Sequence, residues 1–101
     1  MFCVVYRFEV KENSKEQFVR SWKDLTNMFI VHAGSLGSRL HQSKEDIFVA
    51  YAQWPDESTW RLAGDRLPES AQELRETMRQ SCESIHVEHQ LEVLCDLLTK
   101  G

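Results

Sequence analysis

The chain has 101 residues, of which 42% are hydrophobic and 28% are charged, and its formal net charge is −4. These values are typical of a single globular domain and exclude a disordered chain. Lysine and arginine are scattered singly, so the basic stripe that is typical of nucleic-acid binders is absent from the sequence. Even the longest uninterrupted apolar runs, such as Ile47 to Ala52, are too short to span a membrane. The first ten residues do not resemble a secretory signal, and we therefore expect a soluble, cytoplasmic protein.

The cysteines are odd in number and widely spaced. Cys3, Cys82 and Cys95 belong to no paired motif, which predicts reduced thiols that pack as small apolar side chains. The alternative is a catalytic thiol, but each lies in an apolar-periodic segment and none has an obvious neighbouring base.

Residues 2–10 alternate between two kinds of side chain, which predicts a β-strand. One face is strongly apolar, and its members are Phe2, Val4, Tyr6, Phe8 and Val10. The opposite face is mixed, and its members are Cys3, Val5, Arg7 and Glu9.

A long helix is predicted to follow. Asn13 or Ser14 is expected to cap it, with Glu16 or Gln17 completing a capping box. Its apolar stripe has helical spacing and comprises Phe18, Trp22, Leu25 and Phe29. Gly34 is expected to end the helix.

A hairpin comes next, with strands predicted at residues 36–42 and 47–54 around a turn at 43–46. Pro55 ends the second of these strands because it lacks a backbone N–H. Residues 56–64 suit a short helix capped by Asp56.

The last third of the sequence predicts a helix followed by a strand. Pro68 fits the first turn of the helix. The apolar stripe of that helix comprises Ala71, Leu74, Met78 and Cys82. A long final strand is predicted from the alternation of Val87, His89, Leu91, Val93, Cys95 and Leu97.

This order of elements predicts an α+β fold: a single domain over residues 1–101 with the ferredoxin-like split βαβ (βαββαβ) plan. Four antiparallel strands would carry helices on one face only. The other face is mixed and includes Val5, Val49 and Tyr51, so we expect a second subunit to cover it and the protein to be a homodimer. Arg39 and His41 share one face of the second strand, and as outward side chains they would be surface or interface groups.

The sequence predicts no metal and no cofactor. His86 and His89 are three positions apart, so on a regular strand they would face opposite sides of the sheet and could not share an ion. The chain also lacks a glycine-rich phosphate loop and the Gly-x-Ser-x-Gly turn of hydrolases.

Four segments resemble the antibiotic biosynthesis monooxygenase family: CVVYRFEV at the start, GSLGSRLH, FVAYAQWPDESTW and VLCDLL. The resemblance extends over nearly the whole chain and implies homodimers whose two sheets close into an α/β barrel. It also implies chemistry such as cofactor-independent oxygenation of aromatic polyketides and quinols. The haem-degrading branch of the family fits poorly, because Tyr6 stands where that branch has an asparagine and residues 68–82 contain no histidine.

In such a fold a ligand would lie between the sheet and the helices. The candidate catalytic residues are Tyr6, as the polar group, and Trp60, as a pocket wall or lid. The substrate-binding candidates are Trp22, Phe29, Ser38, Ala50, Ala52, Trp54 and Met78. The two alanines are included because they leave room for a ligand. The alternative interpretation is that these aromatic residues simply pack the core of a small domain.

Two functions remain open from the sequence. The first is a cofactor-independent monooxygenase of a small aromatic or quinol-type compound. The second is a non-catalytic dimeric module of the same fold that binds a small ligand or serves as a scaffold.

Overall fold

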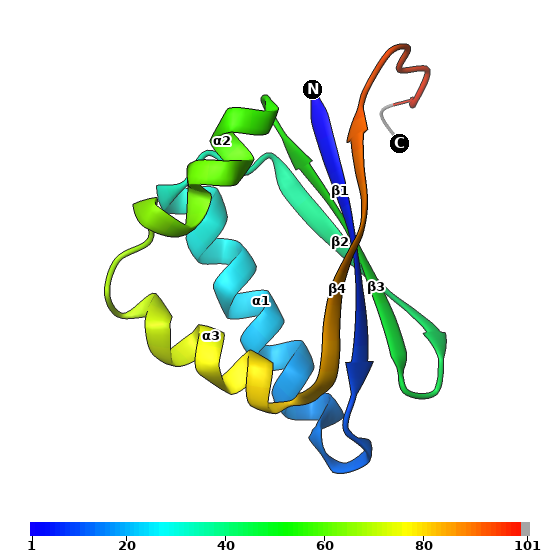
Figure 1. Cartoon of the computed structure of the whole chain (residues 1–101), viewed down its shortest axis with the longest axis vertical. Coiled ribbons are helices and arrows are strands. Elements are labelled where there is room, and N and C mark those ends of the chain that lie inside the picture. The colour runs from blue at the N-terminus through cyan, green and yellow to red at the C-terminus, as the bar shows by residue number, and fades with distance from the viewer. Residues whose placement is uncertain (100–101) are drawn as a thin grey trace.

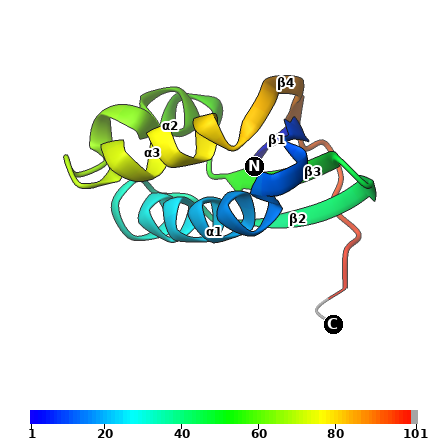
Figure 2. The same cartoon turned by 90° about the horizontal axis from the view of Figure 1, so that it is seen from below.

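The computed structural model describes residues 1–99. Its elements are β1 (Phe2–Val10), a 3-10 turn η1 (Glu12–Ser14), α1 (Lys15–His32), β2 (Gly37–Lys44), β3 (Ile47–Trp54), α2 (Glu57–Leu62), a second 3-10 turn η2 (Ala63–Arg66), α3 (Ala71–Gln80) and β4 (Cys82–Glu92). The strands form one antiparallel sheet in the order β2-β3-β1-β4. The helices all lie on the same face of this sheet (Figure 1), and the view from below shows the two layers (Figure 2). The predicted α+β, ferredoxin-like fold is therefore confirmed.

The core consists of two buried clusters, and the inner strand β1 contributes residues to both. One buried cluster surrounds Val4 and Trp54, and the other surrounds Phe8 and Phe18. Tyr6 is half-buried and packs against both clusters. The alternation of residues in β1 thus places Tyr6, an aromatic residue with a polar hydroxyl group, between the two apolar clusters.

The start of α1 differs from the prediction. Ser14 occupies the cap position, but its side chain makes no capping hydrogen bond, because the 3-10 turn η1 leads directly into the helix. Gln17 does not complete a capping box; its Nε2 donates to Ser81 Oγ at 2.9 Å and ties α1 to the end of α3. Gly34 follows the helix end with φ +79°, a conformation that favours glycine.

The hairpin agrees with the prediction at β3 and differs slightly at β2. A register irregularity between Gln42 and Lys44 lets Lys44 pair with Ile47, so β2 runs to Lys44 and the turn is shorter than predicted. Pro55 follows β3 directly.

Asp56 caps α2 as predicted, since its carboxylate accepts hydrogen bonds from Thr59 N (2.8 Å) and Thr59 Oγ1 (2.7 Å). These bonds lower the pKa of Asp56.

The second half of the chain differs from the prediction in three places. Pro68 lies before α3, which begins at Ala71. Cys82 is the first residue of β4, opposite Val10, and does not belong to the helix stripe. β4 ends at Glu92, so the predicted strand through Val93, Cys95 and Leu97 is wrong: the chain leaves the sheet after Val93 N has donated to Met1 O at 3.0 Å.

A bulge in β4 overturns the argument about its histidines. Tyr6 pairs with Val87 while Val5 pairs with His89, so Glu88 is an extra residue. His86 is opposite Arg7, and His86 and His89 therefore lie on the same, outward face of the sheet. Residues 1–99 nevertheless contain no group of three or more side chains arranged to hold a metal ion.

The outward face of the sheet carries the mixed residues that the sequence predicts. Val49 and Tyr51 are half-buried there, and Arg39 and His41 pair with them from β2 and are exposed. Arg39 and His41 are thus surface groups of the single chain.

Within the described part of the chain, none of the helices combines the length and the apolar character that a membrane span requires.

The three cysteines are free, but they do not share one environment. Cys3 and Cys82 are buried, whereas Cys95 lies beyond the sheet and is exposed, contrary to the expectation that it packs in the core. Burial raises the pKa of the Cys82 thiol to about 11. That thiol is therefore protonated at neutral pH and unsuited to nucleophilic chemistry.

Candidate functional site

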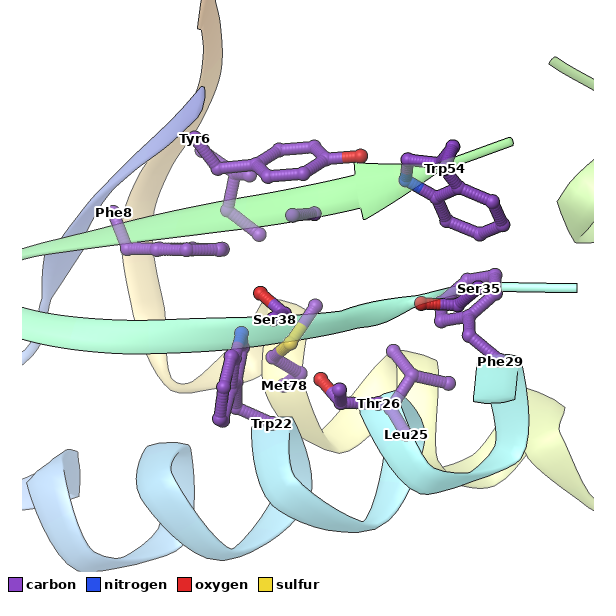
Figure 3. Close-up of a pocket in the computed structure, with 12 residues that line it drawn as sticks. Tyr6, Phe8, Trp22, Leu25, Thr26, Phe29, Ser35, Ser38, Trp54 and Met78 are labelled. Carbon is purple, nitrogen blue, oxygen red and sulfur yellow. The ribbon is translucent and has the colours of Figure 1, made fainter. Parts of the chain in front are cut away.

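A cavity of about 140 Å³ lies between the sheet and the helices α1 and α3. Figure 3 shows the side chains that surround it. Most are apolar and come from six different elements: Tyr6, Phe8, Trp22, Leu25, Thr26, Phe29, Ser35, Ser38, Ala52, Trp54, Met78 and Ile85. The site is thus an apolar chamber with a small number of polar groups, the general form of a small-molecule pocket.

The space exists because small residues on β2 and β3 face large residues on α1. Ser38 and Ala52 are paired across β2 and β3, and both face the helices. The α1 side chains that face them are large and recur at helical spacing, as Trp22 and Phe29 do. Small residues on one wall and large residues on the other leave a gap at native packing density.

Tyr6 carries one of the polar groups of the cavity. Trp60 Nε1 donates to the Tyr6 hydroxyl oxygen at 2.7 Å. Burial raises the pKa of Tyr6, and the hydrogen bond from Trp60 offsets part of that increase. The phenol is therefore protonated at neutral pH. Its oxygen accepts from Trp60, and its own proton has no acceptor among the side chains of residues 1–99.

Trp54 carries a second donor. Its side chain is 3% exposed, and its indole Nε1–H has no hydrogen-bond partner in the described part of the chain. The ring packs edge-on against Phe29, with centroids 5.8 Å apart. Figure 3 shows the indole nitrogen of Trp54 and the hydroxyl of Tyr6 turned toward each other. An unpaired buried donor costs about 1–3 kcal/mol, which a ligand oxygen at this point would relieve.

The serine hydroxyls of the cavity are already engaged. Ser38 Oγ donates to Tyr51 O at 2.9 Å, and Ser35 Oγ accepts from Gly37 N at 3.0 Å. No carboxylate, histidine, lysine or arginine lines the cavity among residues 1–99. The arrangement can therefore hold and polarise an oxygen atom, but it supplies no side chain suited to proton transfer near neutral pH.

The structure brings together all but two of the residues that the sequence nominated. Those that line the cavity are Tyr6, Trp22, Phe29, Ser38, Ala52, Trp54 and Met78. Ala50 does not reach it, because this residue is 1% exposed and lies in the cluster around Phe8 and Phe18. Trp60 is not a wall of the cavity either; it contacts Tyr6 and the Phe2 ring.

Sequence reasoning did not nominate five lining residues: Phe8, Leu25, Thr26, Ser35 and Ile85. Phe8 and Leu25 belong to predicted apolar faces, and Thr26 is four positions after Trp22, so helical spacing could have identified them. Ile85 precedes the predicted start of the last strand. Ser35 lies in the connection between α1 and β2, where no periodic signal exists.

The family comparison agrees with this geometry. The model of the antibiotic biosynthesis monooxygenase family matches residues 1–63, which is more than half of the chain. The protein belongs to this family. The matched region spans β1 to the end of α2 and includes Tyr6, Trp54 and Trp60.

Solved structures of other proteins share the fold of this family member. A variant of SnoaB, a cofactor-independent oxygenase from Streptomyces nogalater, has a TM-score of 0.78 at 18% identity, with 95% of each chain covered. A putative antibiotic biosynthesis monooxygenase from Nitrosomonas europaea has a TM-score of 0.77 at 16% identity, covering 94% of this chain and 100% of that one. At these identities the likeness establishes the fold alone. No curated protein sequence gives a significant match.

Proposed function

We propose that this family member is a cofactor-independent monooxygenase of a small aromatic, quinol-type compound that binds in the cavity between sheet and helices. The observation that carries the proposal is the pair of donors, Tyr6 O–H and Trp54 N–H, at a cavity whose other walls are mostly apolar. Family membership and the fold shared with SnoaB support it.

The chemistry needs little more than such a pair. In a representative conversion a quinol and O2 give a hydroxyquinone and water. One ring C–H becomes C–OH and the two quinol hydroxyls are oxidised to carbonyls; one oxygen atom of O2 forms the new hydroxyl, and the other leaves as water. The substrate first loses a proton and becomes an enolate or phenolate, which passes an electron to O2. Tyr6 and Trp54 would hold the oxygen on which negative charge develops, in a site with little water. Because none of the described residues that line the cavity is a base, the first proton would pass to water.

The size of the cavity favours a small substrate. A cavity of roughly 150 Å³ in another protein holds one benzene ring. The 140 Å³ found here is therefore matched to a single aromatic ring. Larger ring systems would have to extend through an opening or displace side chains.

We further propose that the protein is a homodimer, with the outward face of the sheet covered by a second copy. Val49 and Tyr51 are half-buried on that face, and Leu91 is 44% exposed. A partly apolar sheet face of this kind is more stable against protein than against water. A cytoplasmic location is part of the same proposal.

A second candidate function is favoured by the cavity lining, which contains no base among residues 1–99. A non-catalytic member of the family would bind a ligand through the same two donors without converting it. The two functions differ in whether bound ligand leads to consumption of oxygen.

An oxygen-electrode assay with a single-ring quinol tests the proposal, with tryptophan fluorescence as the measure of binding. We expect saturable quenching of tryptophan fluorescence. We also expect oxygen uptake well above the rate of spontaneous oxidation, and this uptake should persist when a chelator is added. Quenching without enzyme-dependent uptake would favour the non-catalytic function. If wild type shows no quenching and no oxygen uptake, the proposed site is contradicted.

A further inference from the structure

We infer that Trp60 is a positioning residue that fixes the Tyr6 hydroxyl as a donor toward the cavity, so that the site selects ligand atoms that accept hydrogen bonds. This inference rests on the proposed function and specifies which chemical form of the ligand binds.

The direction of the hydrogen bond follows from the chemistry of its two partners. An indole N–H can only donate, whereas a phenolic O–H can donate and accept. The 2.7 Å contact between Trp60 Nε1 and Tyr6 Oη therefore occupies an acceptor position on the tyrosine oxygen. The hydroxyl hydrogen must then point away from Trp60. Since Tyr6 lines the cavity and Trp60 does not, the proton is directed to the cavity side.

Trp60 is held firmly enough to impose this direction. Its ring lies 5.7 Å from the Phe2 ring, centroid to centroid, and the Arg61 guanidinium lies 5.5 Å from its ring centroid. It also packs against the buried cluster around Val4 and Trp54. The helix that carries it begins at the Asp56 cap. Trp60 is thus part of the rigid frame, and not the movable lid that its sequence position suggested.

Two fixed donors make the site selective. The Trp54 N–H cannot accept a hydrogen bond, and the Tyr6 hydroxyl is prevented by Trp60 from turning its proton away. A ligand oxygen that is ionised or a carbonyl satisfies both donors. A neutral ligand hydroxyl must point its own hydrogen away from both donors, toward walls that are mostly apolar. Trp60 therefore raises the affinity of an anionic oxygen relative to that of its protonated form.

The probe for the test is 4-nitrophenol, a single-ring compound that ionises near neutral pH and whose two forms have different absorbance spectra. The measured quantity is the ratio of phenolate affinity to phenol affinity, obtained from titrations on both sides of its ionisation. We expect Trp60→Phe to lower this ratio several-fold and Tyr6→Phe to lower it about tenfold, the range of a hydrogen bond to a charged group. The double variant should match Tyr6→Phe, because Trp60 acts only through Tyr6.

Two controls separate positioning from a merely structural role. Tyr51→Phe changes the other tyrosine, on the outward face of the sheet, and should leave the ratio unchanged. Nitrogen-15 NMR of the indole groups needs no ligand: the Trp60 N–H signal should shift in Tyr6→Phe, and only the Trp54 N–H signal should shift strongly when 4-nitrophenolate is added to wild type.

The outcomes distinguish this inference from the function on which it rests. Equal weakening of both ligand forms by Trp60→Phe, or additive effects in the double variant, would overturn the positioning role and leave the cavity as the binding site. If Trp60→Phe does not fold, the Trp60 indole shift in Tyr6→Phe decides, and an unmoved signal would overturn the role. If wild type does not bind 4-nitrophenol in either form, the proposed site itself is wrong, and this inference fails with it.

Discussion

Tyr6→Phe is expected to lower oxygen consumption with a quinol substrate by about a hundredfold or more while much of the binding remains. The substitution removes one hydroxyl and keeps the ring that packs against both core clusters. Loss of one donor to a developing anion costs about 2–4 kcal/mol of transition-state stabilisation. Binding should change less, because the walls of the cavity are unaltered.

The same substitution has a predictable side effect. The Trp60 N–H loses its acceptor in Tyr6→Phe, which should lower the free energy of unfolding by about 1 kcal/mol. Adding Trp60→Phe should restore part of that loss without restoring activity. Because burial raises the pKa of Tyr6 above its ordinary value of 10.0, any loss of rate from Tyr6 ionisation should begin at a higher pH than it would for an exposed tyrosine. If wild type is active and Tyr6→Phe matches it, the assignment of the polar residue is wrong.

Val49→Asp is expected to convert the proposed homodimer to monomers. Val49 is half-buried in the middle of the outward sheet face, where it pairs with Arg7 on β1 and His41 on β2. A second copy on this face would bury the new carboxylate together with its neighbour Arg7, and removing charged groups from water costs several kcal/mol even when they are paired. Sedimentation equilibrium at micromolar concentration should therefore give twice the chain mass for wild type and the chain mass for the variant.

A matched control introduces the same charge on the other side of the molecule. Val31 lies on α1 and is 73% exposed, so Val31→Asp should remain dimeric. Circular dichroism should show that both variants are folded. A monomeric wild type, or a Val49→Asp variant that sediments like wild type, would contradict the proposed interface.

The fold was predictable because two of its strands, β1 and β3, show a clear two-residue alternation in their sequences. Alternation in β1 and β3 separates inward from outward side chains, and Pro55 and Gly34 mark the ends of elements. β4 was predicted poorly because the bulge at Glu88 exchanges the faces of the residues beyond it. An extra residue of this kind leaves no periodic signal, and it is the reason that His86 and His89 share a face.

The sequence predicted most of the side chains that face the space between sheet and helices, but it did not predict their arrangement and hydrogen bonds. Helical and strand periods place Trp22, Phe29 and Ala52 on the faces that meet. They do not reveal that Ala50 is covered by its neighbours or that Trp54 has an unpaired N–H. The bond between Trp60 and Tyr6 joins residues 54 positions apart, and only the packing of α2 against the sheet brings them together.

A crystal structure of the protein with 4-nitrophenolate tests the central claim most directly, namely that a ligand oxygen is held between Tyr6 and Trp54. We predict the ring in the cavity beneath Ala52, with the phenolate oxygen within hydrogen-bond distance of both Tyr6 Oη and Trp54 Nε1. A ligand bound on the outward face of the sheet, or bound in the cavity with its oxygen directed away from both donors, would contradict the account.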